Sequence, residues 1–197
     1  MNPNNGEVLA LVSAPGYDLN LFTKSISRKD YNKLLKDPRK PLINRAINGQ
    51  YPPGSTLKPF VGLIALEEGI VDSNKFVPCS GAYVLDNHKR PFKCWKKEGH
   101  GSTDLSYALT QSCDVFFYRI AELTGIDIIS DKIDKYGFGQ KTYIDLYNES
   151  KGLVPNRDWK YKMKQQPWFP GETLNVGIGQ GYFLATPIQL TLATSTL

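Results

Sequence analysis

The stretch of sequence that decides the fold is Tyr51-Pro52-Pro53-Gly54-Ser55-Thr56-Leu57-Lys58-Pro59-Phe60. Its two prolines and glycine predict a rigid turn, and the residues after them predict a helix that begins at Ser55 or Thr56. This helix should run to about Glu68, with Gly69 as its C-terminal cap. Because Ser55 and Lys58 are three positions apart, the helix would place both side chains on one face, one turn apart.

This serine–lysine pair has the composition of an activated nucleophile. A serine hydroxyl attacks poorly until a base removes its proton, and an unprotonated lysine amine within hydrogen-bond reach can be that base. The positive end of the helix dipole favours the alkoxide, and the backbone N–H of Ser55, at the helix start, can donate to an oxyanion. A Ser-x-x-Lys tetrad alone is weak, because such tetrads arise by chance and often represent a helix cap followed by a solvated lysine.

A second candidate motif, Ser112-Cys113-Asp114, lies 57 residues after Ser55. It falls at an expected break between one helix that starts near Thr103 and another over residues 115–123, which Gly125 should end. The segment over residues 72–102 is rich in Pro, Gly, Asn and Lys and has no periodicity. We expect it to form a long loop or small subdomain. A loop of that length without secondary structure needs a crosslink to hold it or a function of its own.

The remaining segments carry weaker signals. Alternating apolar residues at 7–13 predict a strand, and Ala14-Pro15-Gly16-Tyr17 predicts the turn that ends it. The other expectations are a polar loop with a short helix at 28–37, a short helix at 126–135, a turn-rich stretch at 139–175, and a final helix from Pro187.

The composition indicates a single globular domain. The chain has 197 residues, 41% hydrophobic and 22% charged, with a net charge of +5, which argues against disorder.

Basic residues gather at 89–97 and 160–164. They form either a solvated face or a contact for an anionic partner such as a lipid headgroup or diphosphate. Nothing in the sequence resembles a nucleic-acid-binding module, so no nucleic-acid partner is expected. No apolar stretch approaches the roughly 18 residues of a membrane span, and the N-terminus is no signal peptide, so any export signal would lie upstream.

Several stretches together resemble the transpeptidase domain of class B penicillin-binding proteins, closest to the elongation type, penicillin-binding protein 2. Residues 51–60 look like the active-site signature, and residues 112–114 match the second motif in a Ser-x-Asp form. The stretches that also resemble this family, over essentially the whole chain, are residues 6–22, Asn44-Arg45-Ala46, residues 177–181 and Ala185-Thr186-Pro187.

The resemblance implies an α+β, mainly helical fold of the penicillin-binding transpeptidase type, similar to serine β-lactamases. It implies a peptidoglycan D,D-transpeptidase for cell-wall crosslinking and cell shape, and a target of β-lactams. In this reading Ser55 attacks the penultimate D-alanine of a stem peptide and Lys58 accepts its proton. Ser112 relays a proton to the leaving amine, and Asp114 orients groups or contacts substrate.

The third motif of the family, Lys-Thr-Gly, is absent after residue 187. In the family it lies on a strand that lines the cleft and supplies an oxyanion-hole N–H. We therefore expect residues 1–197 to be a partial transpeptidase domain without its C-terminal sheet strands, and to be inactive or severely impaired alone.

The three cysteines, Cys79, Cys94 and Cys113, allow three interpretations. They are a disulfide plus a free thiol, three separate buried thiols, or ligands of a metal. With His100 they give the spacing C-x14-C-x5-H-x12-C, a Cys3His set suited to tetrahedral zinc. His88 or, less favourably, Asp86 could replace His100.

The resemblance also implies zinc, because some elongation-type members hold zinc beside the active site through matching positions. A closed four-ligand site would be structural, and it would tie Cys113, and with it Ser112 and Asp114, to the 79–100 loop.

The resemblance further implies a place at the periplasmic face of the bacterial inner membrane, with an anchor helix upstream. The implied partners are peptidoglycan stem peptides or their lipid-linked precursor, β-lactams, a SEDS-type glycan polymerase and elongation-complex proteins.

Two rival functions remain: a serine β-lactamase, for which no deacylating base can be assigned, and a non-catalytic β-lactam sensor or scaffold. The tryptophans Trp95, Trp159 and Trp168 are expected to pack loops.

Overall fold

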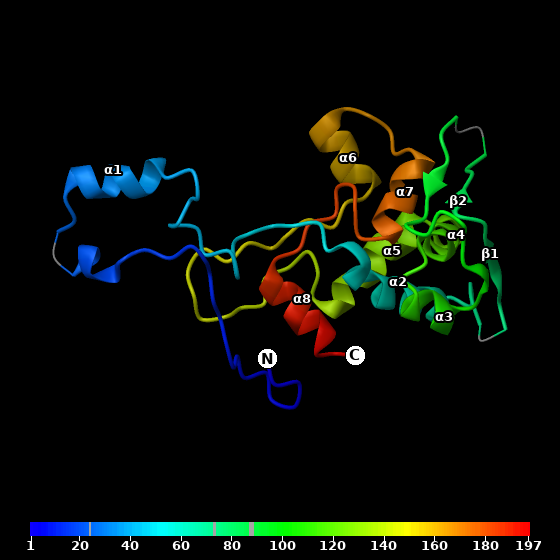
Figure 1. The fold of residues 1–197 in the computed structure, drawn as a ribbon, viewed down its shortest axis with the longest axis horizontal. Coiled ribbons are helices and arrows are strands. Elements are labelled where there is room, and N and C mark those ends of the chain that lie inside the picture. Colours follow the sequence, from blue (N-terminus) through cyan, green and yellow to red (C-terminus); the bar gives the residue numbers. More distant parts are fainter. Residues whose placement is uncertain (24, 73, 87–88) are drawn as a thin grey trace.

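The structure is a computed structural model that describes residues 1–197 except residues 24, 73 and 87–88. Its helical body is built around α4, Asp114–Thr124, which is apolar on most of its circumference and ends at Gly125. α4 packs against α7, Pro170–Gly177, and against α2, Lys58–Glu67 (Figure 1). A Cβ atom on Gly177 would lie 2.4 Å from the Cβ of Ala121, so the small residue lets α7 approach α4 closely.

The helix predicted over residues 55–68 is confirmed. It opens with a 3-10 turn, η2, Gly54–Leu57, and continues without interruption as α2. Pro59 fits the first turn of α2 because a proline there removes no intrahelical hydrogen bond. Gly69 follows the helix with a φ of +65°, as a C-terminal glycine should.

The other expected helices are also present, and most begin at residues that cap them. Asp104 accepts a hydrogen bond from the backbone of Tyr107 at the start of α3, and Thr186 does the same for Gln189 at the start of α8. The bounds are Leu105–Thr110 for α3, Ile126–Lys132 for α5, Ile133–Tyr136 for the 3-10 turn η3, and Pro187–Thr194 for α8.

The segment over residues 72–102 is a small subdomain with two short antiparallel sheets. Strand β1, Val77–Cys79, pairs with β4, Gly101–Thr103, in a register that places Cys79 opposite Gly101. Strand β2, Ala82–Tyr83, pairs with β3, Phe92–Lys93. Both sheets pack against α4, so the subdomain lies beside the helix that begins in the second motif.

The N-terminal part extends away from this body (Figure 1) and contains η1, Leu19–Phe22, and α1, Arg28–Lys36. The strand predicted over residues 7–13 is wrong for this structure. A strand is stabilised by its hydrogen-bonded ladder, and within the described ranges residues 7–13 pair with no other strand. Val12 is accordingly 81% exposed.

The turn-rich character predicted for residues 139–175 is present up to residue 156, but two helices follow it. This region contains α6, Arg157–Lys164, and α7. Asn156 caps α6 through the backbone of Trp159, and Pro170 occupies the first turn of α7. Such residues also favour turns, so the start signals of two short helices resembled loop composition. Among the described residues, no helix has the length and apolar character needed to cross a membrane.

Candidate active site

A tight turn brings Ser55 to the start of its helix. Tyr51 forms two backbone hydrogen bonds of 2.9 Å with Ala185, and the N–H of Gly54 donates to the carbonyl of Gly179 at 2.8 Å. A Cβ atom on Gly179 would lie 2.1 Å from the Gly54 carbonyl oxygen, so only glycine fits there. The loop over residues 177–181 therefore supports the turn that positions the candidate nucleophile.

Lys58 is buried, at 1% exposure, and its Nζ contacts three acceptors. They are the Ser112 carbonyl at 2.9 Å, Ser112 Oγ at 3.0 Å and Asp114 Oδ1 at 2.7 Å. The amine also lies 5.4 Å from the centre of the Phe117 ring. A lysine with the three donors of its charged form is satisfied by this set, and its burial requires such partners.

Ser112 connects the lysine to the candidate nucleophile. Its Oγ lies 2.9 Å from Ser55 Oγ and 3.0 Å from Lys58 Nζ, so the three groups form a continuous hydrogen-bonded chain. The sequence predicted a direct Ser55–Lys58 contact, whereas in the structure Ser55 Oγ is bonded to Ser112. Ser112 has a φ of +52°, a left-handed conformation that costs about 1–2 kcal/mol for a residue with a Cβ. Such strain is concentrated at functional sites.

Asp114 joins the lysine to the small subdomain. Its Oδ1 accepts from Lys58, and its Oδ2 accepts from the backbone N–H of Trp95 at 3.2 Å. Asp114 is the first residue of α4, where the helix dipole stabilises a negative charge. The second motif thus supplies both a hydroxyl beside Ser55 and a carboxylate beside Lys58.

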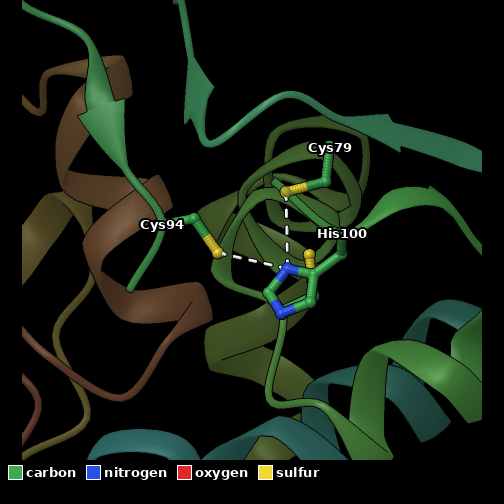
Figure 2. A group of neighbouring side chains, drawn as sticks. Cys79, Cys94 and His100 are labelled. Atoms are coloured by element: carbon green, nitrogen blue, oxygen red, sulfur yellow. Dashed lines mark hydrogen bonds between the residues drawn. The ribbon is translucent and has the colours of Figure 1, made fainter. Parts of the chain in front are cut away.

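The four predicted metal ligands come together in one buried cluster. Their candidate ligand atoms, from Cys79, Cys94, His100 and Cys113, all lie within 4.8 Å of one another. Figure 2 shows the sulfurs of Cys79 and Cys94 directed at the His100 ring, 3.5 Å and 3.6 Å from its Nδ1. A tetrahedral zinc ion holds sulfur and nitrogen ligands about 3.6 Å apart, so these residues fit zinc.

The chemistry of the cluster agrees with this geometry. All three cysteines are free thiols, which rules out the disulfide interpretation for this structure. Burial raises the pKa of the Cys113 thiol to about 12 and lowers the pKa of His100, so both groups are neutral at pH 7 in the metal-free chain. Of the two substitute ligands, Asp86 is exposed and outside the cluster, and His88 lies outside the described residues.

The comparisons with known proteins agree with the fold and with this site. A family model described as the penicillin binding protein transpeptidase domain matches residues 1–197. The chain belongs to this transpeptidase family. It is 47% identical over 196 residues to the peptidoglycan D,D-transpeptidase MrdA of Escherichia coli, covering all of this chain and 31% of that protein.

Two solved transpeptidase structures are similar over nearly the whole chain. Penicillin-binding protein 2 of Pseudomonas aeruginosa, in complex with WCK 5153, has 45% identity and a TM-score of 0.93, covering 99% of this chain and 44% of that one. Penicillin-binding protein 2 of Helicobacter pylori, in complex with MreC, has 43% identity and a TM-score of 0.91, covering 96% and 36%. The chain spans about a third of the length of the curated relatives it matches. The expected transpeptidase fold is confirmed.

The prediction that the tryptophans pack loops holds for Trp168 but not for Trp95, which lies exposed beside the site. Trp168 is buried, and its Nε1 donates to Thr173 Oγ1, so it packs a loop as expected. Trp95 is instead 61% exposed, although its Nε1 donates to the Gln111 carbonyl at 3.0 Å. Sequence reasoning missed Trp95 and Gln111 as neighbours of the site. The one available signal was that they adjoin Cys94 and Ser112 along the chain.

Proposed function

We propose that this chain is the catalytic part of a peptidoglycan D,D-transpeptidase that forms an acyl-enzyme on Ser55. The observation that carries the proposal is the chain of contacts from Ser55 Oγ to Ser112 Oγ to Lys58 Nζ, at 2.9 Å and 3.0 Å. This chain of contacts supports the assignment of Ser55 as nucleophile, Ser112 as relay and Lys58 as base. The family membership of residues 1–197 supplies the reaction class.

The contacts of Lys58 are compatible with two protonation states. As an ammonium, it donates to all three of its acceptors. As a neutral amine, it keeps two donors, for the Ser112 carbonyl and Asp114, and its lone pair accepts from the Ser112 hydroxyl. The Ser112 oxygen is then able to accept from Ser55. Hydroxyl hydrogens rotate, so the same heavy-atom positions serve both states.

The acylation step follows from the second state. Ser55 Oγ attacks the carbonyl carbon of the penultimate D-alanine, and its proton passes to Ser112 while the Ser112 proton passes to Lys58. The reverse transfer gives a proton to the departing amine of the terminal D-alanine as its C–N bond breaks. The backbone N–H of Ser55, in the first turn of η2, is suited to the oxyanion.

Labelling with a fluorescent penicillin tests this proposal. The sequence as given contains no Lys-Thr-Gly or Lys-Ser-Gly, so we would replace the matching segment of E. coli MrdA with residues 1–197. This chimera should bind one penicillin at Ser55. Ser55→Ala should abolish labelling, and the exposed serine variant Ser106→Ala should retain it. A chimera that folds but is never acylated would overturn the proposal.

The two rival functions give different outcomes in the same assay. A serine β-lactamase would release the bound penicillin within seconds, because it hydrolyses the acyl-enzyme. A sensor would keep the label but would not join two stem peptides. We expect a long-lived acyl-enzyme together with crosslinking of peptide donors to amine acceptors.

A structural zinc ion bound by Cys79, Cys94, His100 and Cys113 is part of this proposal. The buried Cys3His set and its sulfur–nitrogen separations support it. Zinc would supply no reaction chemistry, because four protein ligands leave no open position. Elemental analysis should find about one zinc per chain, lost in Cys113→Ser. A Cys–Cys disulfide without zinc, found by mass spectrometry, would end this part of the proposal.

The location and partners are proposals that rest on the family. We place the chain at the periplasmic face of the inner membrane, acting on stem peptides of the lipid-linked precursor or the existing wall. The complex of the H. pylori relative with MreC supports elongation-complex proteins as partners. A chain 36% identical to this one belongs to a solved peptidoglycan synthase complex that coordinates polymerization and crosslinking. That complex supports a glycan polymerase as a partner, and we propose one of the SEDS type. Co-purification of the chimera with these proteins from cells, compared with Ser55→Ala, tests whether association depends on catalysis.

A further inference from the structure

Trp95 is exposed and yet fixed in place beside the candidate active site. Its indole N–H donates to the carbonyl of Gln111, the residue before Ser112, and its backbone N–H donates to Asp114. Its ring lies edge-on to His100, with ring centres 5.3 Å apart. Despite these anchors 61% of the residue is exposed. A held aromatic surface that faces solvent is suited to contact a ligand, because little side-chain freedom is lost on binding.

The position of Trp95 relates it to the second half of the proposed reaction, in which the acyl group passes from Ser55 to an acceptor amine. In the second half, an acceptor amine attacks the ester carbon of acyl-Ser55, a C–N bond forms, and the C–Oγ bond breaks. The amine loses a proton and Ser55 Oγ gains one, and Ser112 Oγ, 2.9 Å from Ser55 Oγ, is placed to pass it. The amine must therefore arrive next to Ser112. Trp95 is bonded to the residues on both sides of the Ser112–Cys113 pair, so it borders that approach.

Next to Trp95 along the chain, positive side chains outnumber the single negative one, Glu98. Lys93, Lys96 and Lys97 flank it along the chain, and Lys93 and Lys97 are exposed. The backbone of this stretch is fixed, since the Lys97 carbonyl oxygen lies 2.0 Å from where a Cβ of Gly81 would be and Gly99 donates to the Lys96 carbonyl. A surface with an excess of positive charge attracts ligands of negative charge. An amine that carries its own carboxylate, as an amino acid does, fits such a surface.

We propose that Trp95, with Lys93, Lys96 and Lys97, forms an acceptor subsite, in which the ring contacts the incoming amine substrate and the lysines attract its carboxylate. This inference rests on the proposed transpeptidase function and deepens it. Trp95 is then a specificity-determining residue for the second half of the reaction.

The test measures how one acyl-enzyme divides between water and an amine. The chimera is acylated with a thioester of a D-alanine peptide in the presence of a D-amino acid. Product analysis gives the ratio of aminolysis to hydrolysis. Both products come from the same acyl-enzyme, so a change in the acylation rate does not alter the ratio. Trp95→Ala should lower it about threefold to tenfold, the size of one lost aromatic contact. Tyr161→Ala, which removes an aromatic residue 64% exposed on α6, should leave it unchanged.

Two further variants separate contact from positioning. Trp95→Phe keeps a ring but loses the hydrogen bond to Gln111, and it should retain most of the ratio. A loss equal to that of Trp95→Ala would show that Trp95 acts through Gln111 and would overturn the ring contact. The double variant Lys96→Gln, Lys97→Gln should lower severalfold the preference for the D-amino acid over its carboxamide, which keeps the amine but lacks the carboxylate. Added salt should do the same. An unchanged preference would overturn the charge assignment.

The failure of this inference is distinguishable from failure of the proposed function. If the chimera forms no acyl-enzyme, both fail. If it forms the acyl-enzyme and Trp95→Ala leaves the ratio unchanged while zinc content confirms a folded loop, only the acceptor subsite is overturned.

Discussion

Lys58 Nζ and Asp114 Oδ1 lie 2.7 Å apart, and the lysine of this pair is almost fully buried. Asp114 also accepts from the backbone N–H of Trp95, so one carboxylate connects the candidate base to the small subdomain. A buried amine requires such partners, and the contact keeps Lys58 Nζ 3.0 Å from Ser112 Oγ.

Asp114→Ala should destabilise the fold and slow the acylation of Ser55. The variant leaves the buried amine of Lys58 without its carboxylate partner, and the loss of one partner of a buried ion pair costs about 3–5 kcal/mol. The measurements are thermal unfolding and the rate of acylation by a fluorescent penicillin in the chimera. Asp131→Ala, on the exposed side of α5, should leave both unchanged. An unchanged acylation rate in Asp114→Ala would contradict the assignment of this contact as the one that positions the base.

Two variants of Ser112 separate the effect of losing its hydroxyl from the effect of relieving its backbone strain. Ser112→Ala removes the relay hydroxyl but keeps a Cβ at a φ of +52°, while Ser112→Gly removes both the hydroxyl and the strain. Both variants should slow acylation by about 10²–10⁴, the usual contribution of a positioned proton-transfer group. Ser112→Gly should be the more stable of the two by about 1 kcal/mol. Thermal unfolding and penicillin labelling of the pair measure the two effects, and equal stability would mean that the turn relaxes around alanine.

The parts of the fold and site that the sequence predicts are those with local signals. Ser55 and Lys58 share a helix start, so their proximity follows from three residues of spacing. Ser112 was placed at a helix break by the pattern around it, but its position between Ser55 and Lys58 depends on how α4 packs against α2. Local patterns do not contain that packing, which is why a direct Ser55–Lys58 contact was expected.

The failures have the same physical origin. Residues 7–13 alternate as a strand does, yet a strand requires a partner, and none of the described residues provides one. Asn156 and Pro170 begin helices here although both residue types also begin turns. Trp95 is tied to Gln111 and Asp114, 16 and 19 residues away, and such long-range hydrogen bonds leave no periodic trace in a sequence.

Gly179→Ala should impair the site without touching any reacting group. Its Cβ would lie 2.1 Å from the Gly54 carbonyl oxygen, and its φ of +70° disfavours any residue with a Cβ. The turn before Ser55 must move, which should destabilise the fold by about 2–4 kcal/mol and slow acylation more than tenfold. Gly16→Ala is the matched control, because nothing lies within 4 Å of its added Cβ. Unfolding temperature and labelling rate should change for Gly179→Ala alone, and an unperturbed labelling rate would show that the 177–181 loop does not support Ser55.

Zinc uptake by the metal-free chain should release protons at pH 7, one of them from Cys113. Burial raises the pKa of Cys113 to about 12, and a thiol must lose its proton to bind zinc. His100 adds none, because burial lowers its pKa and it is already neutral. The sign follows directly: protons compete with the metal, so the apparent zinc affinity should fall as the pH is lowered. Calorimetric titration in buffers of different ionisation enthalpy counts the protons, and Cys113→Ser should release fewer than the unaltered chain. Uptake without proton release would mean that the ion binds elsewhere, through carboxylates, and that Cys113 is not a ligand.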